Sequence, residues 1–225
     1  MNVLPCLGLI AALGSAPFLI ALSRWLRSDS WAVGSRLAFW GAAIVVVVIA
    51  RASGTAWYAS LGLGPLTWPE FGLSAFGAAC MMLGATTAQL LMRGKFGKPS
   101  SRQSRPAQGM QRLSFAYRCF IVVTAAVTEE VLYRGYAIGI GQHLLGGVWL
   151  ASVVSVIIFT VAHYRWGLAQ LPPVFICAVV VTMLFVLTQN LWVSMIAHGI
   201  TDCVGFIAMP VAAARRQRQL ASSSG

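Results

Sequence analysis

The sequence predicts an all-α integral membrane protein, a polytopic bundle of about seven transmembrane helices, within a range of six to eight. Of its 225 residues, 58% are apolar and only 9% are charged, and the mean hydropathy is +0.78. The apolar residues also fall into separate stretches of membrane-spanning length. A soluble enzyme, a DNA-binding domain and a disordered tail are excluded, because none could expose this much apolar surface to water.

Seven apolar stretches account for the predicted helices. The first has no charged residue and is followed, not preceded, by Arg24 and Arg27, which is typical of a retained span and not of a cleaved signal peptide. The second is short, and its span extends past Arg36 or Arg51. The stretches cover residues 3–22, 37–50, 71–92, 114–140, 148–163, 172–187 and 191–213.

Basic residues dominate the segments between and after these stretches. The net charge is +11, and residues 93–112 carry six basic residues and no acid. Because positive segments stay in the cytoplasm, this linker and the basic tail should be cytoplasmic, and seven spans then place the N-terminus outside. We expect a three-span region (1–92), a cytoplasmic linker (93–112), a four-span core (113–213) and a cytoplasmic tail (214–225).

The few acidic residues carry the functional signal. Of five acids in the chain, Glu129, Glu130 and Asp202 lie in or beside apolar stretches, as do two of the three histidines, His163 and His198. Such groups are expensive at membrane depth and are therefore functional candidates.

The fourth stretch contains Glu129, Glu130 and Arg134, with nothing that breaks a helix before Gly135. Glu130 precedes Arg134 by four residues, which favours an ion pair on one helical face. Glu129 lies about 100° around the helix and is left free for chemistry. The alternative is that both glutamates reach the headgroups from a helix end.

Two further pairs have the same four-residue spacing. Phe159 and His163 end the fifth stretch, and His198 and Asp202 lie in the seventh. They can converge with the glutamates only inside the bundle, yet His163 should lie nearer the cytoplasmic end and His198 nearer the other. Tilted or broken helices must close that gap.

In this order, the three motifs resemble the CPBP family of intramembrane proteases, which includes the CAAX prenyl endopeptidases and bacteriocin-processing, Abi-like members. The motifs are Glu129-Glu130-x-x-x-Arg134, Phe159-x-x-x-His163 and His198-x-x-x-Asp202. The resemblance covers about residues 113–213, and the first three spans match nothing specific.

The resemblance implies a glutamic-type endopeptidase, from a family formerly classed as metalloproteases, in which Glu129 and His163 activate a water. His198 and the residue four later would stabilise the oxyanion, with Glu130, Arg134 and Phe159 supporting the site. Where the family usually has Asn, this chain has Asp202, which must be protonated to donate, or must orient His198 instead.

The resemblance also implies the surroundings of the reaction. No cofactor is required, and the substrate is a peptide or protein with a membrane-associated C-terminal or leader segment. The partners are this substrate and the lipid bilayer, without nucleic acid. We expect a multi-pass protein of the bacterial inner (cell) membrane with a cytoplasmic C-terminus.

Three alternatives remain open at this point. Glu129, His163 and His198 could hold zinc or another divalent metal, although HExxH is absent. The residues could form the ion or proton pathway of a small transporter, although the motifs occupy only the C-terminal half and no inverted repeat is visible. A non-catalytic protein that binds a partner peptide is the third.

Overall fold

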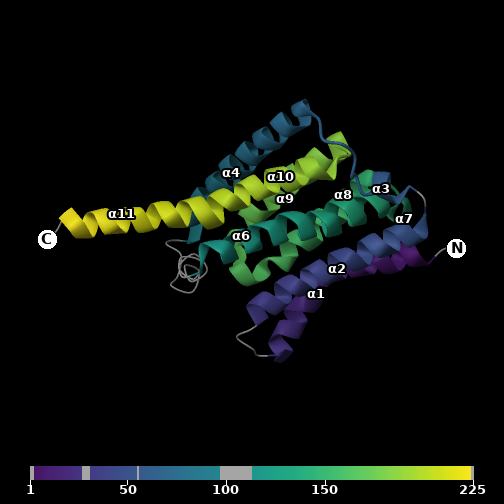
Figure 1. Ribbon diagram of the computed structural model, residues 1–225, viewed down its shortest axis with the longest axis horizontal. Helices are drawn as coiled ribbons and strands as arrows, with labels where there is room; N and C mark the ends of the chain where they lie inside the picture. The colour runs from purple at the N-terminus through teal and green to yellow at the C-terminus, as the bar shows by residue number, and fades with distance from the viewer. Residues whose placement is uncertain (1–2, 27–30, 55, 97–112, 224–225) are drawn as a thin grey trace.

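Long helices run back and forth along the molecule, with the N-terminus and the C-terminus at opposite ends (Figure 1). The computed structural model describes residues 3–26, 31–54, 56–96 and 113–223, and every regular element in these ranges is a helix. The long elements are α1 (Leu4–Leu26), α2 (Trp31–Ser53), α4 (Trp68–Phe96), α6 (Phe115–Thr124) continued by η1 (Ala125–Glu129) and η2 (Val131–Ile140), α8 (Val148–Ala162), α9 (Leu171–Thr188), and α10 (Leu191–Asp202) continued by η5 (Cys203–Ala208) and α11 (Met209–Ser223).

Short elements join the long ones. They are α3 (Trp57–Ser60), α7 (Gln142–Leu145) and the 3-10 turns η3 (Tyr164–Trp166) and η4 (Leu168–Gln170). Each of the seven predicted stretches therefore coincides with a long helix or a continuous run of helical elements.

Five helices in the described part of the chain are long and apolar enough to cross a membrane. They cover Gly34–Ser53, Trp68–Met92, Val148–Trp166, Leu168–Thr188 and Leu191–Arg215, while the apolar helix Leu4–Leu19 is shorter. The fourth predicted stretch is not among them, because it carries two arginines and two glutamates. The all-α, multi-pass membrane architecture is confirmed, and the helix count agrees roughly with the prediction.

The fourth stretch is not the uninterrupted α-helix that the sequence predicts. The α-helix ends at Thr124, and the next two elements, η1 and η2, are π-helical. Side-chain hydroxyls reach carbonyls in this widened stretch: Thr128 donates to the Thr124 oxygen at 2.7 Å and Ser155 to the Tyr133 oxygen at 2.8 Å. Such π-helical turns are rare in proteins as a whole, and those that occur are frequently found at functional sites.

The π-helical stretch η2 is the core of the molecule. Every residue from 130 to 139 is buried, as expected for a helix surrounded by others. Helices α1, α2 and α8 pack on η2, and α10 packs on η1. The charged motif of the fourth stretch therefore lies inside the bundle and not at a helix end.

The predicted N-terminal region packs directly on the predicted catalytic core. Helix α4 lies against α9 and α10, Trp40 of α2 donates to the Thr124 hydroxyl at 3.1 Å, and Tyr136 of η2 donates to the Pro5 carbonyl at 3.3 Å. Most of the predicted basic linker, residues 97–112, lies outside the described residues. The predicted tail is described as far as residue 223, where it forms the end of α11.

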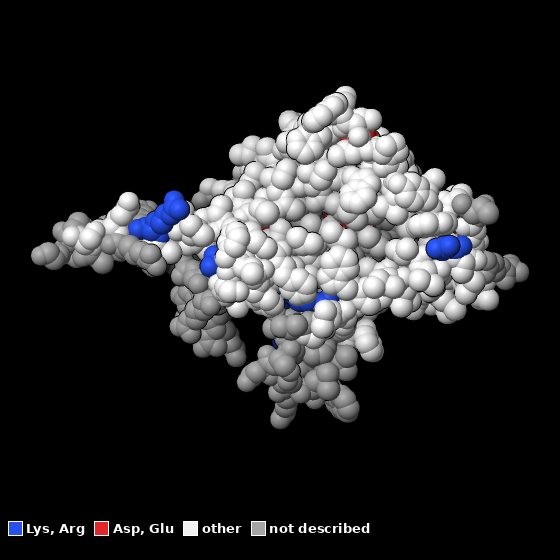
Figure 2. Space-filling model, viewed as in Figure 1, with Lys and Arg blue, Asp and Glu red and all other residues white. Residues whose placement is uncertain are grey.

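The visible surface carries few charged side chains (Figure 2). Large apolar side chains are exposed on several helices, including Phe76 and Leu83 on α4, Val153 on α8 and Leu187 on α9. Lipid is the solvent that such a surface requires.

Candidate active site

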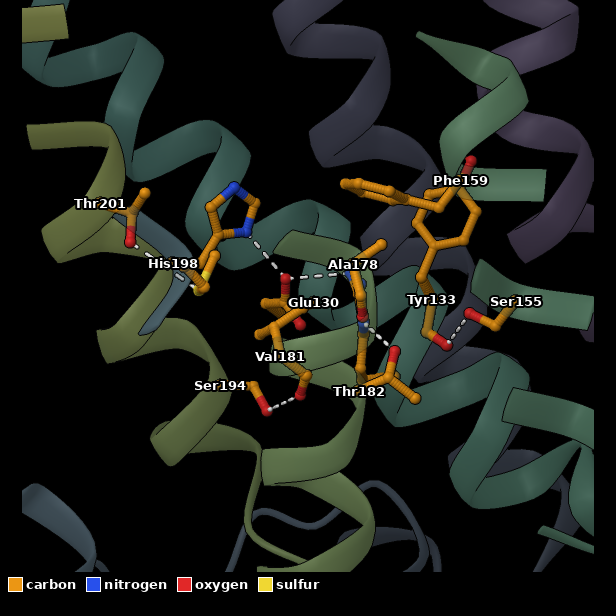
Figure 3. Close-up of polar contacts among 12 residues, drawn as sticks. Glu130, Tyr133, Ser155, Phe159, Ala178, Val181, Thr182, Ser194, His198 and Thr201 are labelled. Atoms are coloured by element: carbon orange, nitrogen blue, oxygen red, sulfur yellow. Dashed lines mark hydrogen bonds and ion pairs between the residues drawn. The ribbon is translucent and has the colours of Figure 1, made fainter. Parts of the chain in front are cut away.

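Glu130 is the centre of a buried polar cluster (Figure 3). Its side chain is 0% exposed, and its Oε1 accepts a hydrogen bond from Arg134 Nη1 at 3.1 Å. The same Oε1 lies 2.8 Å from His198 Nδ1. The ion pair that the four-residue spacing predicts is therefore present, and it has a third member from another helix.

Arg134 is also 0% exposed, and α9 supplies its remaining partners. Its Nε donates to the Thr182 hydroxyl and its Nη2 to the Ala178 carbonyl, both at 3.3 Å. The guanidinium lies over the Phe159 ring, 4.6 Å from its centroid. A buried charge needs such a complete set of partners, so Arg134 serves to hold Glu130.

His198 lies between two carboxylates. Its Nδ1 faces Glu130, and its Nε2 lies 3.6 Å from Asp202 Oδ2, too far for a hydrogen bond but close enough for an ion pair. Next to His198, Gly199 faces the small side chain of Ala126 on η1, where an added Cβ would be in ordinary contact at 3.5 Å. Close packing of α10 on η1 brings His198 to Glu130, although the sequence places them at different depths.

Glu129 has a different environment from its neighbour. It is half-buried, and it makes no hydrogen bond or ion pair with another residue of the described ranges. Its carboxylate nevertheless lies within electrostatic range of Tyr133, His198 and Asp202. Glu129 is therefore beside the cluster without being tied into it.

His163 is fixed by the end of α8. The last turn tightens, so the His163 amide bonds to the Thr160 carbonyl, while His163 Nδ1 lies 2.8 Å from the Phe159 carbonyl oxygen. Since a carbonyl only accepts, Nδ1 carries the proton and a neutral His163 has its lone pair on Nε2. The ring lies between Phe159 and Trp166, with centroids 4.7 and 4.8 Å away.

Phe159 connects the two motifs. Besides stacking near His163 and Arg134, its ring contacts Tyr133 edge-on, with the centroids 5.1 Å apart. No hydrogen bond or ion pair joins His163 to Glu129 in the described part of the chain. Within the same residues, no group of three or more His, Cys, Asp or Glu side chains is placed to hold a metal ion.

Sequence reasoning missed several residues around the cluster. Thr182 is a hydroxyl in the middle of the apolar helix α9, a signal that could have marked it as a buried partner. Arg36 is a second missed residue, and its buried Nε has no hydrogen-bond partner. Asn190 caps α10 by accepting from the Trp192 amide, and its side-chain amide donates to the Pro65 carbonyl and to Glu70. These partners lie outside the site, so the side chain of Asn190 has a structural role.

Fold and site together define a multi-pass membrane protein with a buried carboxylate and histidine cluster in its C-terminal half. Residues 111–204 match the family described as type II CAAX prenyl endopeptidase Rce1-like. The matched region contains all seven motif residues, and the resemblance to the CPBP family is confirmed. Over these residues the chain is similar to a family of CAAX proteases.

The family match covers fewer than half of the 225 residues, and α1, α2 and α4 lie outside it. No curated protein and no solved structure matched the chain.

Proposed function

We propose that the chain is an intramembrane endopeptidase that cleaves a membrane-associated peptide or protein with a water activated by Glu129 and His163. The observation that carries the proposal is the unequal environment of the two glutamates. Glu130 is tied to Arg134 and His198, whereas Glu129 is half-buried and lacks such partners among the described residues. A general base must be free to take a proton.

In the proposed mechanism, Glu129 takes a proton from water while the lone pair on His163 Nε2 accepts the other O–H. The resulting hydroxide attacks the scissile carbonyl carbon. The C–N bond of the substrate then breaks as Glu129 gives its proton to the leaving amine nitrogen. His198 supplies an Nε2–H to the oxyanion when both of its nitrogens are protonated. The carboxylate of Glu130, 2.8 Å from Nδ1, supports that form. Oriented donors of this kind contribute on the order of 3 kcal/mol.

Asp202 is assigned to the oxyanion as a protonated carboxyl. Its Oδ2 lies 3.6 Å from His198 Nε2. This short distance supports a shared role in which the Asp202 hydroxyl and the His198 Nε2–H both donate to the oxyanion. Asp202 is half-buried within electrostatic range of Glu129 and Glu130, and such surroundings oppose another negative charge.

The proposed substrate carries a membrane-associated C-terminal or leader segment, because the cluster lies among helices of membrane-spanning length. The proposed location is the inner (cell) membrane of a bacterium, with the C-terminus in the cytoplasm. In this arrangement the four-span region 113–213 carries the chemistry, and the first three helices support it from both sides.

The test uses the purified full chain in proteoliposomes with peptides anchored in the same bilayer. Mass spectrometry should show a new peptide end in the presence of wild type and none with Glu129→Gln. Binding of a peptide without cleavage by wild type would instead support a non-catalytic peptide-binding protein.

The proposed reaction requires no metal ion. Activity should therefore survive prolonged treatment with a strong chelator, since a carboxylate-activated water does not depend on a bound cation. Loss of cleavage on chelation and recovery with added zinc would transfer the assignment to a metal-dependent peptidase using Glu129, His163 and His198.

A further inference from the structure

Helix α2 brings a cation to the candidate site from outside the region that matches the protease family. Helix α2 packs on α6, η1 and η2, and Trp40 bonds to Thr124 where α6 becomes η1. Arg36 precedes Trp40 by four residues and therefore lies on the same face of α2. Arg36 is thus turned toward the widened helix that carries Glu129.

Arg36 is half-buried, and one nitrogen of its guanidinium lacks a partner. Its Nε is buried without a hydrogen-bond partner, and no ion pair joins Arg36 to a carboxylate in the part of the chain that the structure describes. Arg134 offers the contrast, because three acceptors and an aromatic ring surround it. A buried, unpaired donor is costly, so Arg36 is suited to an acceptor that arrives from outside.

A neighbouring acidic group indicates where that acceptor would lie. Arg36 is within electrostatic range of Asp202, whose carboxylate faces His198 at 3.6 Å. An anion bound by Arg36 would therefore lie close to the reacting groups. Without a cation, the carboxylate of Glu129 would repel it.

We propose that Arg36 binds the C-terminal carboxylate of the substrate, which makes it a specificity-determining residue. The proposal rests on the proposed peptidase function and names the substrate end that this site takes. A guanidinium matches a carboxylate with two parallel N–H groups. The terminal carboxylate is also the one anion that every linear peptide carries, whatever its side chains.

The depth of Arg36 agrees with this assignment. Arg36 is five residues from Trp31, the start of α2, or about 8 Å along the helix at 1.5 Å per residue. A chain end could therefore reach Arg36 without carrying its charge to the middle of the membrane, where it would be expensive.

The experiment compares two membrane-anchored peptides that differ only in a free C-terminal carboxylate or a C-terminal amide. Wild type should cleave the acid peptide with a kcat/KM about tenfold higher, equivalent to about 1.4 kcal/mol, and mainly through KM. Arg36→Gln should cleave both peptides equally, and Arg36→Lys should retain part of the preference. Arg51→Gln is the matched control, since Arg51 is exposed near the other end of the same helix.

Three results would overturn the proposal. Wild type could show no preference for the acid peptide, or Arg36→Gln could lower cleavage of both peptides by the same factor. The second result would assign Arg36 to balancing the charge of Asp202. The third result is that Arg36→Gln lowers cleavage only in bilayers with anionic lipid, and equally for both peptides. This result would assign Arg36 to binding a lipid phosphate.

Binding to an inactive background separates this inference from the peptidase function. Glu129→Gln protein in proteoliposomes should bind the fluorescent acid peptide more tightly than the amide, and the added Arg36→Gln substitution should remove the difference. This measurement holds even if wild type cleaves neither peptide, in which case the peptidase proposal alone would fail. Equal binding of the two peptides would refute the role of Arg36.

Discussion

Two adjacent glutamates in this chain have different surroundings. Glu130 accepts from Arg134 and lies 2.8 Å from a nitrogen of His198, whereas Glu129 is half-buried beside them. The peptide geometry alone separates them, because successive residues of a helix point in different directions. One carboxylate can therefore be structural while its neighbour reacts.

Substitution of each glutamate by Gln tests this division. Glu129→Gln should leave the protein folded and inactive, since Gln keeps the shape but cannot take a proton. Glu130→Gln should lower yield and the midpoint of thermal unfolding, because breaking a buried pair costs about 3–5 kcal/mol. Thermal unfolding in detergent and peptide cleavage measure both. A stable, inactive Glu130→Gln together with an active Glu129→Gln would reverse the assignment.

The proposed role of Asp202 as a donor to the oxyanion requires its carboxyl to be protonated. If its carboxyl is protonated and donates to the oxyanion, Asp202→Asn replaces one donor with another, and activity should persist with a weaker fall at alkaline pH. If Asp202 is ionised and orients His198, the change should cost roughly two or more orders of magnitude in rate. We expect the first result, because the carboxylates of Glu129 and Glu130 oppose a third negative charge.

The pH–rate profiles of wild type and Asp202→Asn, measured side by side, decide between these outcomes. A variant that is nearly inactive at every pH would exclude the donor role. Unfolding midpoints of the two proteins provide the control for a purely structural loss.

Local pairs could be predicted from the sequence, and tertiary contacts could not. The spacing of Glu130 and Arg134 predicts their ion pair, because both lie on one helix. The contact of His198 with Glu130 depends on how α10 packs on η1, and the spacing of residues along the chain does not show which helices pack together. The isolated position of Arg36 beside the second stretch likewise gives no sign that it approaches Asp202.

At the scale of the elements, close packing of small residues determines where the π-helical segment lies. A Cβ on Gly139 of η2 would lie 2.0 Å from the Ser60 carbonyl oxygen of α3. This oxygen belongs to the backbone, so it cannot rotate away. The sequence does not predict the π-helical hydrogen bonding of η2, which contains Gly139.

Gly139→Ala should therefore destabilise the protein by about 1–3 kcal/mol, the usual cost of overpacking. The control is Gly14→Ala in α1, where an added Cβ meets nothing within 4 Å and stability should change little. Thermal unfolding in detergent measures both variants. Equal unfolding midpoints for the two variants would show that α3 shifts to accommodate the added Cβ without loss of stability.

At the scale of the whole molecule, charge and helix direction predict one orientation in the membrane. The two ends of the chain lie at opposite ends of the molecule (Figure 1), as an odd number of crossings requires. Basic residues are concentrated in the segment 93–112 and in the tail, and such segments stay in the cytoplasm. The C-terminus should therefore be cytoplasmic and the N-terminus outside.

Reporter fusions test this orientation in cells. A fluorescent protein fused after residue 225 should fluoresce, whereas alkaline phosphatase at the same position should be inactive, because the phosphatase folds only outside the cytoplasm. The opposite pattern is expected for reporters inserted at Gly146, in the turn between α7 and α8, which also serves as the control for expression. An external N-terminal tag should be removed by protease added to spheroplasts, in which the outer face of the inner membrane is accessible. If the tag were protected while the C-terminal result held, the chain would cross the membrane an even number of times, and one of the seven long helical runs would not span it.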